Sequence, residues 1–413
     1  MNILRCATAG SVDDGKSTLI GRLLYDTKSL FDDQLAAVEA VSDARGDDYT
    51  DLSLITDGLR AEREQGITID VAYRYFSTPR RKFIVADTPG HTQYTRNMVT
   101  GASTADLALI LADARKGLVE QSRRHAFLCS LLGVPRLVLC VNKMDLAGFD
   151  EARFEEIRVE FTEYARQVGA EQVTVVPMSA LRGDNVVNKS ANMPWYDGPP
   201  LLELLENAPT GPSDHTTGAR FPVQYVIRPQ STTVTDHRSY AGQMAGGVLR
   251  AGDEVVVMPS RTPTTITRIN APSGPVAEAR PPMSVTLEIA DELDISRGDL
   301  LCRPEDVPTV ASELDALVCW MDEGAPFAPG QRYVLKHTTR RVRARVEVID
   351  RRLDINTLQE EPAEALTCNE IGRVRFRTTA PLIFDEYRLN RTLGGFILIN
   401  ESTHHTVGAG III

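Results

Sequence analysis

The sequence predicts an α/β domain, with a mostly parallel sheet and helices on both faces, followed by two all-β barrel domains. Three observations lead to this prediction. Apolar runs alternate with amphipathic runs in the first half, a linker (PTGPSDHTTG) occupies residues 209–218, and short β-branched runs between Gly and Pro turns fill the second half. A chain of 413 residues also exceeds what one hydrophobic core usually supports.

The first half supplies the elements of the parallel sheet. Candidate strands are residues 4–9, 82–86, 107–113, 137–141 and 173–177. Candidate helices are residues 17–24, 92–100, 121–132 and 151–168. Tyr73, Tyr75 and the Thr78-Pro79 turn before Lys82 indicate one hairpin with an antiparallel strand.

The second half has the sequence pattern expected of β-barrels. Candidate strands include residues 221–227, 254–258, 285–289 and 342–348. A second boundary near residues 308–313 divides this half in two. We therefore expect domains at residues 1–212, 219–310 and 313–413.

The segment GSVDDGKS at residues 10–17 has the spacing of a phosphate-binding loop, between a predicted strand and a predicted helix. Gly10 and Gly15 permit turns that aim successive N–H groups at phosphate oxygens. Lys16 is expected to neutralise the β- and γ-phosphates, and the Ser17 hydroxyl to bind Mg²⁺. The alternative is a glycine-rich turn that merely starts a helix, and the spacing and context disfavour it.

Two further segments follow predicted strands, where ligands bind in open α/β sheets. Asp87 begins the segment DTPGH, which places its carboxylate near Mg²⁺ and the Gly90 N–H near the γ-phosphate. Asp145 ends the segment NKMD, and its carboxylate can accept hydrogen bonds from the N1–H and N2–H₂ edge of guanine. In isolation the two segments would be a Pro-Gly turn and a solvated turn. Together with the phosphate loop they predict a guanine nucleotide site.

Other residues complete the predicted site. Asn142 would brace the loops, the stem of Lys143 would cover one face of the base, and Ser179 and Ala180 would offer backbone N–H groups. Thr68 is the candidate second hydroxyl ligand of Mg²⁺, on a segment ordered by the γ-phosphate. Taken alone, Thr68 would be a threonine at a strand edge.

These motifs resemble those of translation-factor-type GTPases, the superfamily of elongation factor Tu. The resemblance covers essentially the whole chain and implies a GTPase domain followed by two β-barrels. It implies that His91, Lys16 and Thr68 are catalytic, with His91 orienting the water that attacks the γ-phosphate. The residues implied in binding GTP and Mg²⁺ are Gly10, Ser11, Val12, Asp13, Asp14, Gly15, Lys16, Ser17, Thr18, Thr68, Asp87, Thr88, Pro89, Gly90, His91, Asn142, Lys143, Met144, Asp145, Ser179 and Ala180.

One departure narrows the resemblance. Translational members carry histidines where this chain has Ser11 and Asp14. With residues 57–76 and 93–98, this variant resembles the GTP-binding subunits of bacterial ATP sulfurylases (sulfate adenylyltransferases). That resemblance implies a partner, the small catalytic subunit, which makes adenosine 5′-phosphosulfate and pyrophosphate from ATP and sulfate. It also implies a heterodimer or a higher assembly. The sequence fits this division of labour, because it has neither a second phosphate loop nor a Ser-Gly-Gly-Lys-Asp-Ser segment for ATP.

Two alternatives remain open. One is a translation factor that delivers aminoacyl-tRNA, which would need a basic face on the barrels and is disfavoured by Ser11 and Asp14. The other is a nonenzymatic switch that binds GTP without driving chemistry.

Bulk composition limits the partners and the location. The net charge of -11 and the pI near 5.3 argue against a nucleic-acid partner. The six cysteines are scattered without a Cys-x-x-Cys pair, which indicates buried free thiols in a reducing cytosol. The phosphate loop begins within ten residues of the N-terminus, which leaves no room for a signal peptide, and no apolar run reaches about 18 residues. We therefore expect a cytoplasmic protein without a membrane segment.

Overall fold

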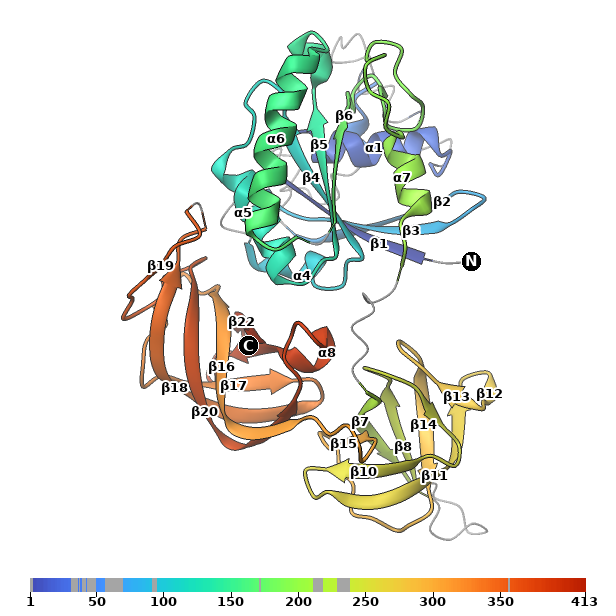
Figure 1. The fold of residues 1–413 in the computed structure, drawn as a ribbon, viewed down its shortest axis with the longest axis vertical. Helices are drawn as coiled ribbons and strands as arrows, with labels where there is room; N and C mark the ends of the chain where they lie inside the picture. Colours follow the sequence, from blue (N-terminus) through green and yellow to red (C-terminus); the bar gives the residue numbers. More distant parts are fainter. Residues whose placement is uncertain are drawn as a thin grey trace. The chain divides into compact units, whose positions relative to one another are not determined.

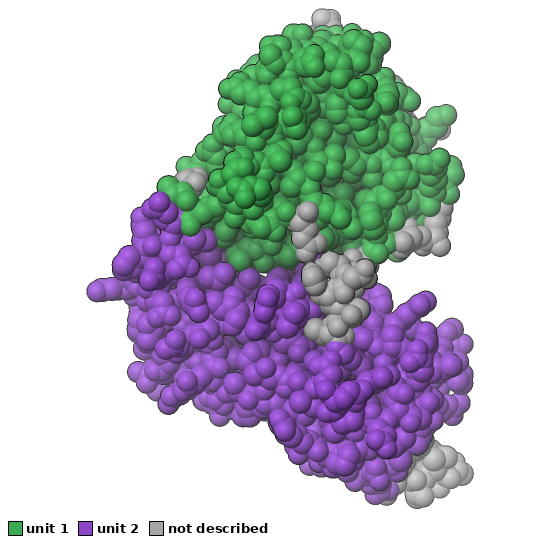
Figure 2. Space-filling model, in the orientation of Figure 1, with its two compact units in different colours: residues 1–212, 355–358 green, residues 213–354, 359–413 purple. Residues whose placement is uncertain are grey.

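The structure is a computed structural model that describes residues 3–30, 36, 38, 42, 50–55, 70–90, 95–170, 172–210, 218–228, 238–355 and 357–413. It divides into two compact units, which Figure 2 colours separately. Unit 1 comprises residues 1–212 with 355–358, and unit 2 comprises residues 213–354 with 359–413. Most of the predicted linker and most of residues 26–66 lie outside the described residues.

Unit 1 is built on a sheet with the strand order β2-β3-β1-β4-β5-β6. All neighbouring strands run parallel except β2, which pairs antiparallel with β3 as the hairpin signal predicted. The central strand β4 is buried along its whole length, as its continuous apolar run requires. The strands are β1 (Ile3–Gly10), β2 (Ala72–Ser77), β3 (Lys82–Asp87), β4 (Leu107–Asp113), β5 (Arg136–Asn142) and β6 (Gln172–Pro177).

Helices cover both faces of this sheet (Figure 1), with α5 and α6 on one side and α1 and α7 on the other. The α-helices described in unit 1 are α1 (Lys16–Asp26), α4 (Thr95–Ala102), α5 (Glu120–Leu131), α6 (Glu151–Gln167) and α7 (Leu201–Asn207). Two 3₁₀ helices accompany them, η1 (Leu52–Ile55) and η3 (Met144–Ala147). The predicted fold class of this half is confirmed. The helix α7 was not predicted, because its seven residues follow two prolines and are too few for a helical period to stand out.

Unit 2 contains two antiparallel barrels, which confirms the fold class of the second half. In the first barrel the strand order is β10-β15-β7-β8-β14-β11-β12, and a pairing between β10 and β11 closes the sheet. Its strands are β7 (Arg220–Ile227), β8 (Ser239–Gln243), β9 (Leu249–Arg250), β10 (Glu254–Met258), β11 (Thr262–Ala271), β12 (Gly274–Pro275), β13 (Glu278–Ala279), β14 (Ser284–Ile289) and β15 (Leu300–Cys302).

The second barrel has the order β17-β21-β22-β16-β20-β18-β19 and is closed by a pairing between β17 and β18. Its core contains Trp320, Phe327 and Phe376. The elements are β16 (Thr309–Trp320), β17 (Arg332–His337), β18 (Arg340–Leu353), β19 (Glu360–Glu361), β20 (Ile371–Phe384), α8 (Arg391–Gly394), β21 (Gly395–Ile399) and β22 (Thr406–Ile412).

Two strands of this barrel extend beyond their sequence signals. Strand β16 begins at Thr309, inside the boundary expected at residues 308–313, and its first residues already pair with β20. Strand β18 spans 14 residues, whereas the apolar signal marked only 342–348. Register shifts at Val346/Val348 and Ile349/Arg351 break the strict alternation that a sequence pattern detects.

A buried ion pair joins the two barrels within unit 2. The Arg220 guanidinium donates to both Asp385 carboxylate oxygens at 2.9 and 3.1 Å, and to Asp306 Oδ1 at 3.1 Å. Around it lies an apolar cluster that includes Met258, Cys302, Ile383 and Leu393. The two barrels are therefore held together by both charge and apolar packing.

The cysteines match most of the prediction. All six are free thiols; five are buried and Cys368 is half-buried, because it lies near the surface just before β20. In the part of the chain that the structure describes, we find no helix with the length and apolar character needed to cross a membrane.

Candidate functional site

The phosphate loop lies between the end of β1 and the start of α1. Gly15 caps the helix with φ of 93°, a left-handed conformation that favours glycine. A Cβ at Gly15 would lie 2.4 Å from Asn142 Nδ2, so a larger residue would push the loop away from β5. Asp13 also has a positive φ of 68°. The loop is thus folded tightly over the ends of the central strands.

Lys16 is the buried cation of this loop and is only 7% exposed. Its ammonium donates to the carbonyl oxygens of Gly10 at 2.9 Å and Ser11 at 3.0 Å. Burial lowers the pKa of Lys16, and the nearby aspartates, Asp87 first among them, oppose that shift. The loop therefore holds a positive charge that lacks a carboxylate contact among the described residues.

Asp14 supports the loop from within. Its carboxylate accepts a hydrogen bond from the Ser11 N–H at 2.7 Å, and its side chain is buried. Burial raises the pKa of Asp14, although the hydrogen bond from Ser11 and the charge of Lys16 oppose the shift. Ser11 and Asp14, the two positions that depart from the translational pattern, are thus in direct contact.

The end of β3 brings the second motif against the loop. Asp87 pairs with Thr8 across the parallel strands, and the Thr8 hydroxyl donates to Asp87 Oδ1 at 3.4 Å. The Thr88 hydroxyl donates to the Thr8 carbonyl at 2.5 Å. A Cβ on Gly90 would lie 2.5 Å from both the Gly10 oxygen and Lys16 Nζ, so the backbone of Gly90 lies directly against the phosphate loop.

Asn142, at the end of β5, connects three loops. Its Nδ2 donates to the Asp14 carbonyl at 2.8 Å, and its Oδ1 accepts from the Ala180 N–H at 2.9 Å. The next residue, Lys143, has a positive φ of 63°, and its ammonium donates to the Asp13 carbonyl. The NKMD segment is therefore tied to both the phosphate loop and the loop after β6.

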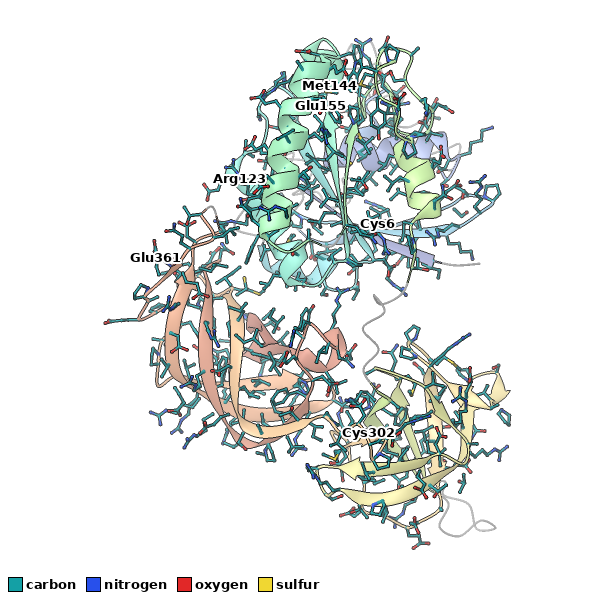
Figure 3. All side chains as sticks on the ribbon, in the orientation of Figure 1. Cys6, Arg123, Met144, Glu155, Cys302 and Glu361 are labelled. Carbon is teal, nitrogen blue, oxygen red and sulfur yellow. The ribbon has the colours of Figure 1, made fainter. Side chains whose placement is uncertain are left out.

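Asp145 lies close to that last loop. Its side chain is 5% exposed, and Arg182 Nε lies 3.6 Å from its Oδ2. Ser179 is buried, and its hydroxyl accepts from the Arg182 N–H at 3.2 Å. Met144, labelled in Figure 3, is completely buried, which anchors the segment in the domain.

The Ser17 hydroxyl and the Asp87 carboxylate are hard oxygen donors, the kind that Mg²⁺ prefers. Asp87 is buried at the end of β3, and Ser17 begins the first turn of α1 beside Lys16. No group of three acidic, His or Cys side chains that could hold a metal occurs among the residues searched, those that the structure describes. The oxygens of Ser17 and Asp87 thus fit a magnesium ion that takes its remaining ligands from phosphate and water.

Comparison with known proteins agrees with this geometry. A family described as "Elongation factor Tu GTP binding domain" matches residues 1–210, and "GTP-eEF1A C-terminal domain-like" matches residues 313–413. The chain is 60% identical to the bifunctional enzyme CysN/CysC of Mycobacterium tuberculosis, covering 100% of this chain and 67% of that protein. It is 50% identical to sulfate adenylyltransferase subunit 1 of Bacteroides fragilis, covering 100% of this chain and 86% of the relative.

The chain belongs to the sulfate adenylyltransferase subunit 1 family. Its first domain is a GTP-binding domain of the elongation factor Tu type. A solved structure of sup35 complexed with GDP aligns over 100% of this chain and 94% of that chain, with 21% identity and a TM-score of 0.45.

Two of the predicted site residues, Thr68 and His91, lie outside the described residues. The structure brings together the others: the phosphate loop, Asp87 to Gly90, Asn142 to Asp145, and Ser179 with Ala180. Their roles toward a nucleotide remain predictions.

The sequence reasoning missed three residues at this site, Arg22, Asp113 and Arg115. Arg22 on α1 donates to the carbonyls of Ala180, at 3.1 Å, and Leu181, and so holds the loop after β6. The Asp113 carboxylate, at the end of β4, accepts a hydrogen bond from Arg115 Nε and forms an ion pair with the Lys143 ammonium at 3.3 Å. Burial raises the pKa of Asp113, but the hydrogen bonds that Asp113 accepts from Arg115 and Lys143 outweigh this effect and lower the pKa to about 2. A signal existed for Asp113, because it ends a strand as Asp87 does.

Proposed function

We propose that this chain is the GTPase subunit of sulfate adenylyltransferase. In this role GTP hydrolysis drives the synthesis of adenosine 5′-phosphosulfate and pyrophosphate from ATP and sulfate by a partner catalytic subunit, in sulfate assimilation. The observation that carries the proposal is Asn142, whose amide connects the phosphate loop to the loop after β6. Its two hydrogen bonds connect the predicted phosphate end to the predicted base end, which supports one nucleotide site in a chain whose relatives include sulfate adenylyltransferase subunit 1.

The phosphate end works by positioning and charge. Backbone N–H groups of residues 10–18 and of Gly90 would bind phosphate oxygens, and Lys16 would leave its two carbonyl partners to neutralise the β- and γ-phosphates. Ser17, Asp87 and Thr68 would hold Mg²⁺, which supplies charge neutralisation between the β- and γ-phosphates. His91 would orient the attacking water.

The base end chooses guanine. The Asp145 carboxylate would accept from guanine N1–H and N2–H₂, which requires Arg182 to share or release it. The Ala180 N–H, already tied to Asn142, and the stem of Lys143 define the remaining walls. Adenine lacks the donors that Asp145 needs.

The partner supplies the chemistry on ATP. Neither the sequence nor the site described here offers a second phosphate loop, so adenylyl transfer belongs to the small catalytic subunit, in a heterodimer or higher assembly. Coupling requires GTP-dependent states that bind the partner differently, and a swing from 1:99 to 99:1 takes about 5.5 kcal/mol of differential binding. Six free thiols favour a reducing, cytoplasmic location.

Reconstitution tests this function. The chain, the catalytic subunit, ATP and sulfate are combined with and without GTP, and adenosine 5′-phosphosulfate is measured together with GTP hydrolysis. GTP should raise product formation, and His91→Ala should slow hydrolysis by on the order of 10² to 10⁴ while it leaves GTP affinity nearly unchanged. GTP binding without any gain in product would indicate a nonenzymatic switch.

Two results of the His91→Ala experiment separate the role of the residue from the role of hydrolysis. Normal hydrolysis would remove His91 as the water-orienting residue. Slow hydrolysis with full GTP-driven synthesis would show that GTP binding alone activates the partner.

A further inference from the structure

Strands β17, β18 and β20 of the second barrel (Figure 1) pair with one another in the order β17-β18-β20, and their outer face is basic. On each of these strands apolar residues point into the core and charged residues alternate with them toward solvent. We call this surface the arginine face. It consists of Arg332, Lys336, Arg341, Arg343, Arg345, Arg351, Arg373, Arg375 and Arg377.

Pairing across the strands places like charges side by side. Arg345 lies directly opposite Arg332 on one side and Arg377 on the other, and Lys336 lies opposite Arg341. Directly opposed residues of an antiparallel pair share a face, and like charges there are destabilising. A chain with a net charge of -11 thus concentrates positive charge at a cost to its own barrel.

Intramolecular ion pairs neutralise four members of the arginine face, and β18 itself carries two acids, Glu347 and Asp350. On β20, Arg375 pairs with Asp315 at 3.1 Å and Arg377 pairs with Glu313, both acids lying on β16. Arg343 pairs with Glu401 at 3.2 Å and Arg351 with Glu360 at 3.7 Å. Within the described ranges no ion pair reaches the remaining members, which are Lys336 and the exposed Arg332, Arg341, Arg345 and Arg373.

We propose that the arginine face binds an acidic surface of the catalytic subunit, an inference that rests on the function proposed above. Arginine guanidinium groups bind carboxylates in bidentate geometry, and arginine is enriched in protein interfaces whereas lysine is depleted. The face has eight arginines and one lysine, as the residues named above show. Carboxylates on such a partner would relieve the repulsion between Arg332 and Arg345, which lie directly opposite each other.

Two observations favour a protein over a nucleic acid. Glu313 and Asp315 lie at the edge of the arginine face, where they would repel a continuous phosphate backbone. Val348, opposite Arg375, is 40% exposed among the charges, as suits a contact with protein side chains. The tRNA of a translation factor is nevertheless an anion that this face could meet, so it enters the test as a rival.

The test compares two double charge reversals in the full chain. Arg332→Glu with Arg345→Glu reverses the centre of the arginine face. Arg268→Glu with Arg280→Glu makes the same change at two exposed arginines of the first barrel. Binding to the purified catalytic subunit is measured by titration calorimetry at about 50 and about 300 mM NaCl, and binding to total tRNA is measured in parallel. GTP binding by the free chain and thermal unfolding check that each variant folds.

The variant on the arginine face should weaken binding of the catalytic subunit roughly 10- to 100-fold at low salt and flatten its salt dependence, and the control should match the wild type. Equal binding by the wild type and the variant, or an equal loss of binding in the control, would show that the arginine face does not bind the catalytic subunit. Either result would leave the proposed function intact. A wild-type chain that does not bind the catalytic subunit would overturn both. Tight tRNA binding that disappears in the face variant would assign the face to RNA instead.

Discussion

The two units of the chain each bury a basic side chain, and they satisfy its charge in opposite ways. In unit 2, Arg220 contacts the carboxylates of Asp385 and Asp306. In unit 1, the contacts of the Lys16 ammonium among the described residues are two carbonyl oxygens. Burial lowers the pKa of both side chains. At Arg220 the hydrogen bonds that it donates to Asp385 and Asp306 more than offset this effect and its pKa is raised, whereas the pKa of Lys16 stays lowered.

This difference separates a structural charge from one that is ready to bind a ligand. A buried ion pair that is fully hydrogen-bonded contributes to holding its surroundings together, and it offers nothing to an incoming anion. A buried ammonium with only neutral partners gains strongly when a phosphate replaces them. The comparison therefore predicts that mutation of Arg220 changes stability and that mutation of Lys16 changes affinity.

The largest effect is expected at Arg220. Arg220→Ala leaves the buried Asp385 without its partner and should lower the free energy of unfolding by about 3 to 5 kcal/mol. Urea unfolding followed by tryptophan fluorescence measures it, in a Trp195→Phe background that leaves Trp320 of the second barrel as the reporter. Adding Asp385→Ala should recover part of the loss. GTP affinity should not change, and a drop in affinity would contradict the division between the two charges.

Lys16→Ala should do the reverse. The loss of charged hydrogen bonds, each worth about 1.5 to 3 kcal/mol, should weaken GTP binding by on the order of 10² or more. Stability should hold or rise, because a desolvated ammonium is removed. Calorimetric titration with GTP measures the affinity, and the exposed Lys116→Ala is the matched control. Wild-type affinity in Lys16→Ala would remove the phosphate loop from the proposed site.

Asp145 extends the comparison to a buried acid with a weak partner. Its contact with Arg182 is 3.6 Å long and Arg182 is 67% exposed, so this pair contributes little stability. Asp145→Asn exchanges an acceptor for a donor against guanine and should cost about 1.5 to 3 kcal/mol per lost hydrogen bond in GTP binding. Preference should move toward xanthosine triphosphate, measured by competition. Arg182→Ala should change affinity far less, and an Asp145→Asn protein that keeps the wild-type preference for GTP would refute the base assignment.

The sequence could predict this site because its parts are local. Strand β4 was predicted with the bounds observed, Leu107–Asp113, because its apolar run is continuous and ends in a charge. The phosphate loop and the NKMD segment each follow a strand, and the carboxyl ends of parallel strands meet at one edge. Spacing along the chain thus carried nearly all of the information about the candidate site.

Reasoning from local sequence patterns could not predict contacts between residues that lie far apart in the sequence. Arg220 and Asp385 are 165 positions apart, and nothing in either local pattern indicates that they meet. Arg22 reaches Ala180 across 158 positions, from a helix whose periodicity marks it only as a surface residue. The arginines of β18 and β20 alternate with apolar residues, but their opposition across strands depends on a register that the sequence alone does not give.

The smallest effect concerns a third buried base, His125 on α5, which is satisfied in yet another way. Its Nε2 accepts from the Gln121 amide at 2.9 Å, and its Nδ1 has no partner among the described residues. Burial, together with the charges of Lys16 and Arg124, lowers the pKa of His125 to about 3 from 6.5. The imidazole is therefore neutral in the fold, so this base avoids a buried charge by losing its proton.

The sign of the resulting pH dependence follows from the two pKa values. Between about pH 6.5 and 3 the unfolded chain binds a proton at His125 that the folded chain does not, so stability falls as the pH falls. From pH 7 to about pH 5 this one residue should cost about 2 kcal/mol. We expect His125→Gln to remove that part of the slope in urea unfolding. The matched control is His405→Gln, a change at an exposed position of the second barrel. Parallel curves for the wild type and His125→Gln would mean that the imidazole is charged or hydrated in the fold, and that it does not satisfy burial by staying neutral.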